Sequence, residues 1–101
     1  MPIGSISSSA LSAIAAYGTG LNVTANNLAN VNSKDFRPST PMMNEDGNGA
    51  VKVTISKSQD TEVDIAKEMV DMMIEASAIK ANIKTLQTED QVIKNLIDIK
   101  V

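Results

Sequence analysis

The chain contains no cysteine and no histidine among its 101 residues, and Tyr17 and Phe36 are its only aromatic residues. Without thiols and imidazoles, disulfides, thiolate nucleophiles, histidine general bases and the common zinc sites are excluded. A core of Leu, Ile, Val, Met and Ala packs well along helices but has few wide anchors, so a large substrate pocket is not expected. We therefore expect no enzyme, no metal site and no cofactor.

The sequence also lacks a long apolar run and a concentration of basic charge. No stretch is apolar enough over 18 residues to span a membrane, and the first 17 residues lack the basic start and apolar run of a secretory signal. The formal net charge is −3, with a pI near 4.7, and the basic residues are scattered. We expect neither nucleic-acid binding nor membrane insertion, and export without a cleaved signal peptide.

A heptad-like apolar pattern dominates residues 64–101. Its positions alternate in steps of four and three, with one gap at Asp90, and are Ile65, Met69, Met72, Ala76, Ile79, Ile83, Leu86, Ile93 and Ile97. This period predicts one long helix, about 55 Å from end to end, which needs a partner helix along its length.

The same segment carries a second apolar stripe. Its members are Val70, Met73, Ile74, Ala81, Val92, Leu96 and Ile99. One partner helix covers only one stripe, and each large side chain left exposed forgoes about 1.5 to 3 kcal/mol of burial. Association with other chains, as a homo-oligomer, is the strongest prediction from residue patterning.

A partner helix is predicted near the N-terminus. Its apolar and small positions also alternate in steps of three and four, at Leu11, Ile14, Gly18, Leu21, Ala25 and Leu28. Gly18 and Gly20 indicate either a kink or a closely approaching backbone. The amides of Asn22, Asn26 and Asn30 share one stripe, either as a solvated face or as contacts with another helix.

In the middle of the chain the apolar residues recur at every second position instead of at the helical spacing. Val51, Val53 and Ile55 alternate with polar residues after a turn-rich stretch at 45–49, which predicts a β-hairpin with its other strand near residues 37–44. Residues 44–49 fit a turn better than a calcium loop, because the bidentate Glu is absent. A helix cap is expected at Asp60 or Thr61.

The predicted fold is mainly α: N- and C-terminal helices pair as a coiled-coil-like hairpin, with a short β-hairpin between them. A flexible N-terminus covers residues 1–9, the first helix 10–33, an extended segment with hairpin and polar joint 34–61, and the long helix 62–101, in a single domain. Asp64 and Glu68, four residues apart, are expected to be solvated partners of the helix dipole and not a catalytic pair.

Two stretches resemble the bacterial flagellar axial family of rod and hook proteins. The first runs from Ala25 through Ser33, followed by Phe36, and is similar to the family's N-terminal signature. The second begins at residues 63–70 and continues through 81–82 to 86–88, similar to the C-terminal helix of the hook and distal-rod branch. The resemblance implies an unusually short variant or a trimmed relative, because residues 34–61 leave room for one hairpin where full hook and distal-rod proteins carry large β-domains.

The resemblance implies a structural subunit of the basal-body rod or hook, whose terminal helices self-assemble into a hollow helical structure. It further implies export through the flagellar type III apparatus, other rod or hook subunits as partners, and a location in the periplasm-spanning rod or the extracellular hook. The alternative is a secreted flagellar regulator or adaptor that forms a closed helical complex with one partner. The residues expected to carry the family motif and the assembly contacts are Leu21, Ala25, Asn26, Asn27, Leu28, Ala29, Asn30, Val31, Asn32, Ser33, Phe36, Ile65, Met69, Val70, Met72, Met73, Ala76, Ile79, Ile83, Leu86, Ile93, Leu96 and Ile97.

Overall fold

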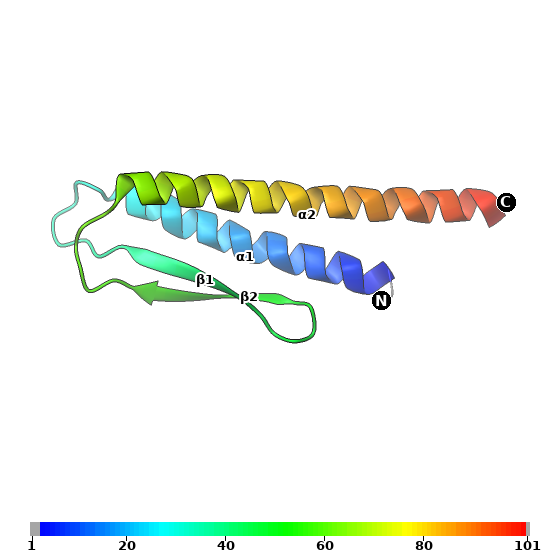
Figure 1. The fold of residues 1–101 in the computed structure, drawn as a ribbon, viewed down its shortest axis with the longest axis horizontal. Helices are drawn as coiled ribbons and strands as arrows, with labels where there is room; N and C mark the ends of the chain where they lie inside the picture. The colour runs from blue at the N-terminus through cyan, green and yellow to red at the C-terminus, as the bar shows by residue number, and fades with distance from the viewer. Residues whose placement is uncertain (1–2, 101) are drawn as a thin grey trace.

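The computed structural model describes residues 3–100 and contains two long helices with a β-hairpin between them (Figure 1). The elements are α1 (Ile3–Ala29), β1 (Ser39–Glu45), β2 (Val51–Lys57) and α2 (Ile65–Lys100). They form an elongated body of 64 × 23 × 14 Å. The predicted mainly α fold with a central hairpin is confirmed.

The helix α1 is the central element of the molecule. Figure 1 shows α1 and α2 running antiparallel, with α1 between α2 and the β-hairpin and with α2 extending past the N-terminal end of α1. Both α2 and the hairpin pack on α1, which lies between their backbones. The buried apolar residues of α1 are Ala10, Ala13 and Ala16, whose short side chains let the neighbouring elements approach closely.

The predicted seam of α1 is wrong by one residue. The buried face is formed by Ala10, Ala13, Ala16, Gly20, Thr24 and Asn27. Leu11, placed in the predicted seam, is 57% exposed. The prediction followed the largest apolar residues, whereas α1 packs through its smallest ones and through two polar side chains.

Helix α1 begins at Ile3, earlier than the expected boundary at residue 10, and residues 3–9 belong to the helix. Tertiary contacts explain this extension, because the hydroxyl of Ser7 donates a hydrogen bond to Glu89 of α2 and Ile6 lines a cavity with Val92. The expected flexibility at residues 1 and 2 lies outside the described residues.

The helix ends differ from the expected ones by a few residues. Helix α1 ends at Ala29, and the chain then turns, with the amide of Asn30 donating to the carbonyl of Asn26. The carboxylate of Asp64 caps α2 by accepting a hydrogen bond from the amide of Lys67 at 3.1 Å. The cap expected at Asp60 or Thr61 is therefore wrong.

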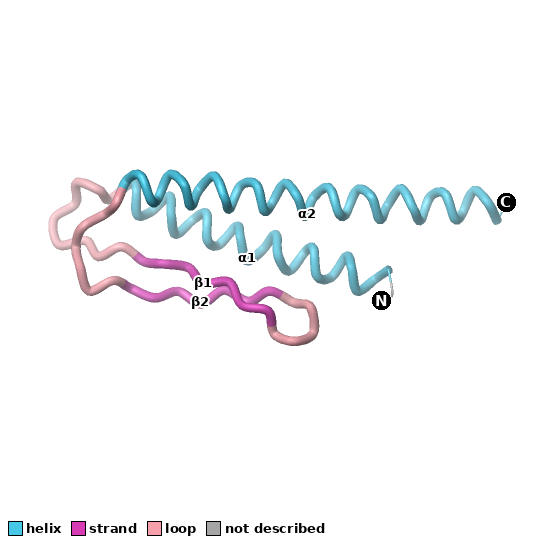
Figure 2. The backbone as a smooth tube through the Cα atoms, in the orientation of Figure 1, coloured by secondary structure: helices cyan, strands magenta, loops and turns pink. Residues whose placement is uncertain are grey.

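The β-hairpin pairs β1 and β2 antiparallel, from Ser39 opposite Lys57 to Glu45 opposite Val51 (Figure 2). Asp46 closes the connecting turn by accepting hydrogen bonds from the amides of Asn48 and Ala50. Gly47 and Gly49 both have φ of 86°, a backbone conformation that favours glycine. This geometry confirms the turn that was predicted there.

Candidate functional site

The face of α2 that packs against α1 is polar. Glu68 and Glu75 are buried on it, and Asn82 and Glu89 are half-buried. These four residues recur every seven positions, so they lie in one row along the inner side of the helix. The contact between the two helices is therefore made by carboxylates and an amide facing small and hydroxyl-bearing side chains.

This polar row divides the predicted apolar seam of α2 into two halves. Met72, Ile79 and Leu86 are half-buried and flank the contact with α1. The other half, which includes Met69 and Ile83, faces away from α1 and is exposed. The prediction that one continuous apolar seam joins the two helices is wrong, because α1 packs on the polar row beside it.

The second apolar stripe of α2 is likewise exposed. We call the exposed apolar side chains on the side away from α1 the outer face of α2; its members are Ile65, Met69, Val70, Met73, Ile83, Ile97 and Ile99. Ile74 and Val92 are also exposed but border cavities beside α1, and Ile93 and Leu96 lie on the side of the polar row where α2 extends past α1. In a globular helix the apolar side is the buried one. Here the large apolar residues face solvent, as expected for an interaction surface.

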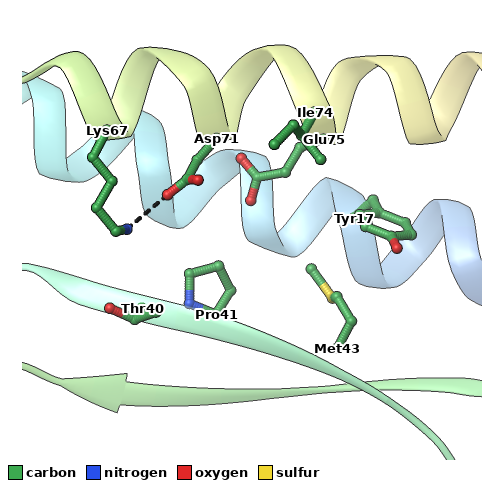
Figure 3. A pocket seen from close by; sticks show the side chains of 8 residues that line it. All are labelled: Tyr17, Thr40, Pro41, Met43, Lys67, Asp71, Ile74 and Glu75. Atoms are coloured by element: carbon green, nitrogen blue, oxygen red, sulfur yellow. Dashed lines mark hydrogen bonds and ion pairs between the residues drawn. The ribbon is translucent and has the colours of Figure 1, made fainter.

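A buried junction joins α1, α2 and β1 beside a cavity of about 250 Å³ (Figure 3). The hydroxyl of Thr24 donates a hydrogen bond of 2.9 Å to the carboxylate of Glu75. A Cβ added at Gly20 would lie 2.6 Å from that carboxylate and 2.7 Å from the terminal methyl of Met43, so these two side-chain ends would have to shift to admit a larger residue. The expectation of a closely approaching backbone is not met, because the atoms near Gly20 are side-chain ends and a Cβ at Gly18 would meet open space.

The charged side chains at this junction differ in their exposure to solvent. Burial raises the pKa of the Glu75 carboxyl, although the hydrogen bond from Thr24 opposes the shift. At the edge of the cavity Lys67 forms a 2.8 Å ion pair with Asp71, and this hydrogen bond raises the pKa of Lys67. The junction thus combines an exposed ion pair with a carboxylate that α1 covers.

Two side chains fasten α1 to the hairpin. The amide nitrogen of Asn27 donates to the carbonyl of Ser39 at 2.7 Å, and its oxygen accepts from the amide of Ser39 at 3.0 Å. The hydroxyl of Ser12 likewise donates to the carbonyl of Val51 and accepts from its amide. Both side chains satisfy backbone groups of the strands, which fixes where each strand lies along α1.

Some side chains of the predicted N-terminal motif are buried or half-buried, and others are exposed to solvent. Asn27 is buried, whereas Leu28, Val31 and Phe36 are half-buried. The exposed amide of Asn30 bonds to the carbonyl and side chain of Asn26, and Ser33 donates to Asn30. Within the described residues, these amides therefore bond locally along the chain.

Sequence reasoning missed the residues of the junction. Ser12, Thr24 and Glu75 were not expected to make specific contacts, and Asn27 was assigned to the motif without a bonding role. The signal that could have identified the inner face of α2 is the polar row at positions 68, 75, 82 and 89, since a polar residue every seven positions marks one side of a helix. Leu21 and the remaining motif positions stay predictions as assembly contacts.

Asp64 and Glu68 were both expected to be solvated, and this expectation is wrong for Glu68. Asp64 is an exposed cap, while Glu68 is buried on the inner face of α2. Among the described residues there is no group of three metal-ligating side chains. Neither helix, over the part that the structure describes, has the length and apolarity of a membrane span.

The fold defines a helical-hairpin protein whose long helix α2 exposes many of its large apolar side chains. Residues 60–99, which contain all of α2 except its last residue, match the family described as flagellar basal body rod FlgEFG protein C-terminal. The match supports the predicted resemblance to the flagellar rod and hook family, and it does not distinguish the hook and distal-rod branch. No curated protein matches the sequence.

The family match supports a structural role in the flagellum and a flagellar location. The family is one of structural rod proteins and is not an enzyme family. The match covers α2, the helix with the most exposed large apolar side chains. The matched region and the candidate interaction surface therefore coincide in α2.

Proposed function

We propose that the chain is an axial subunit of the flagellar rod or hook that self-assembles through α1 and α2 into a hollow helical structure. Its partners are other copies and other rod or hook subunits, and it reaches them through the flagellar type III export apparatus. The proposal builds on the structural role in the flagellum that the family match supports.

The observation that carries the proposal is the exposure of the outer face of α2. Ile83, for example, is 43% exposed and Ile97 is 58% exposed. Burying a large apolar side chain against a neighbour contributes about 1.5 to 3 kcal/mol, so a row of them stabilises an interface strongly. Met72, Ile79 and Leu86 border this face and are positioned to contact both α1 and a neighbouring helix.

The exposed side of α1 offers a different surface. Leu11 is exposed, and Gly18 has open space where a side chain would stand. Helices approach closely where glycine and alanine face a partner, so large residues of α2 fit against this side of another copy. Contacts between two unlike surfaces do not close on themselves in a pair, which favours continued growth of an assembly.

The test is Ile83→Asp, introduced in the cell of origin in place of the native residue. The added charge on the outer face is expected to abolish incorporation into the flagellum and motility while the subunit is still exported, because Ile83 does not contact the buried junction. Asn44→Asp is the matched control, since it adds the same charge to an exposed position of the hairpin, away from α2. Both variants should retain the circular dichroism of the native chain.

Leu28→Asp tests the contribution of α1 in the same way. Because Leu28 is half-buried, its circular dichroism must be compared with that of the native chain before motility is interpreted. Normal filaments from both Ile83→Asp and Leu28→Asp would contradict the proposal. Purification of a closed complex with one copy of a single partner would instead favour an adaptor.

A further inference from the structure

Methionines are distributed unequally between the inside and the outside of the molecule. Met43 reaches the buried junction beside Gly20, and Met72 is half-buried. In contrast, Met69 is 56% exposed and Met73 is 69% exposed, both on the outer face of α2. Met42 is also exposed, on the solvent side of the hairpin.

Met69 and Met73 are four residues apart on one helix, so their side chains lie one above the other. Exposed methionine thioethers are oxidised more readily than those inside a core, and the product is a polar sulfoxide. These two thioethers occupy the surface through which the subunit is proposed to assemble.

We propose that Met69 and Met73 form an oxidation site that controls whether the free subunit can assemble. A peroxide is the oxidant: the sulfur lone pair attacks one peroxide oxygen, the O–O bond breaks, and water leaves after proton transfer. The thioether is oxidised to a sulfoxide and hydrogen peroxide is reduced to water. The control of assembly rests on the proposed function, whereas the site itself does not.

Oxidation should leave the hairpin folded and weaken only the interface. Neither Met69 nor Met73 contributes to the buried face of α1 or to the hydrogen bonds that hold the junction. A sulfoxide on the outer face of α2 must lose its hydration when a neighbouring helix covers it, which opposes association. Within an assembly the same sulfurs are covered, so the free subunit is the sensitive form.

The first measurement is the oxidation rate of each methionine in the full chain, held at low concentration with hydrogen peroxide and followed by peptide mass spectrometry. Met69 and Met73 are expected to oxidise at least about fivefold faster than Met43, because of their exposure. Circular dichroism should not change. Equal rates for Met43, Met69 and Met73, or loss of helix signal on oxidation, would overturn the site.

The second measurement is sedimentation velocity of peroxide-treated and untreated chains at equal concentration. We expect treatment to weaken association of the native chain at least about tenfold, and methionine sulfoxide reductase to restore it. The double variant Met69→Leu/Met73→Leu should associate and resist peroxide, since leucine keeps the apolar surface without the sulfur. Met42→Leu is the matched control and should remain sensitive.

The two proposals fail in different ways. If the untreated chain stays monomeric, the proposed function is contradicted, and with it the effect of oxidation on association. If the untreated chain associates but its doubly oxidised form associates equally well, the oxidation control alone is overturned. If association of Met42→Leu resists peroxide, or association of the double variant is sensitive to it, the effect of peroxide does not arise at Met69 and Met73. Either result would likewise overturn the oxidation control.

Discussion

The β-hairpin and α2 distribute their apolar side chains in opposite ways. In the hairpin, Met43 and Val53 are half-buried towards α1 while Thr54 faces solvent, which is the usual amphipathic arrangement. In α2, the buried Glu75 faces α1 and the exposed Met73 faces solvent. The comparison shows that the hairpin turns Met43 and Val53 towards α1 while Met42 and Ile55 stay exposed, whereas α2 turns a polar row towards α1 and exposes most of its large apolar side chains.

The polar contacts on the inner side of α2 contribute more to the placement of α1 than to the free energy of unfolding. A hydrogen bond such as that between Thr24 and Glu75 adds about 1 kcal/mol net, because both groups give up water to form it. Its direction and partner are specific, however, so together with the bonds of Asn27 and Ser12 it defines one placement of α1 against its neighbours. Substitutions on the two sides of each helix can therefore separate packing within the chain from contacts outside it.

The largest expected effect comes from Ala16→Leu. Ala16 is buried where α1 packs on its neighbours, and three added heavy atoms should force the elements apart, lowering the free energy of unfolding by about 3 kcal/mol. Urea denaturation at a concentration where the chain is monomeric measures this change. Ala15→Leu, at the adjacent exposed position, should change it by less than about 0.5 kcal/mol. Equal effects of the two variants would show that α1 does not bury the side the structure assigns to it.

Asn27→Ala should have the next largest effect. Removing the amide leaves both the N–H and the carbonyl of Ser39 without their partner, at a cost of about 2 kcal/mol in unfolding free energy. Amide hydrogen exchange at Ser39 should also become faster. The neighbouring Asn26→Ala, which removes an exposed amide, serves as the control and should leave exchange at Ser39 unchanged.

Glu75→Gln should stabilise the hairpin by about 1 kcal/mol at pH 7, because it removes a buried charge and keeps an oxygen that accepts from Thr24. The pKa of Glu75 is raised from its ordinary 4.5 in the folded chain. Its contribution to stability is therefore fully present below pH 4.5 and is lost as the pH rises through the raised pKa.

The pH dependence of unfolding tests this assignment. The charged groups facing Glu75 are Lys67, Glu68 and Asp71 of α2, while Thr24 of α1 and Met43 of β1 are uncharged. Urea midpoints of the native chain should fall as the pH rises above 4.5, and those of Glu75→Gln should fall less. Parallel curves for the two proteins would show that Glu75 does not cause the pH dependence of the urea midpoint.

The smallest effect on the monomer is expected from Met73→Ala. Met73 is exposed and alanine favours a helix, so the unfolding free energy should change by less than about 0.5 kcal/mol. Association should nevertheless weaken, because apolar surface is lost from the outer face of α2. Destabilisation of the monomer by several times this amount would mean that the outer face packs within the chain.

Most of the architecture could be predicted from the sequence, because its signals are local. The alternation of Val51 and Val53 and the glycine-containing turn at residues 46–49 identified the hairpin, and the three-and-four spacing identified both helices. The exact helix ends could not be predicted. Ser7 extends α1 through a contact with Glu89 that no local pattern reveals.

The orientation of the helices could not be predicted either, because the usual rule places apolar side chains inside. Leu11 and Met69 were expected in the seam between the helices and are exposed. A charged residue such as Glu75 is not expected in an apolar seam. Helix α1 nevertheless covers it, because Thr24 donates a hydrogen bond to its carboxylate and Gly20 lies beside it. The excess of apolar residues on α2 that α1 does not cover was predicted correctly, although the division of the seam by the polar row was not.

Sedimentation velocity of the purified chain over a wide range of concentrations tests directly whether the outer face of α2 joins subunits. If unlike surfaces of α1 and α2 meet in successive copies, the average mass should grow reversibly with concentration without reaching a fixed size. A species that remains monomeric, or that stops at a closed dimer or tetramer, would contradict open assembly through these helices.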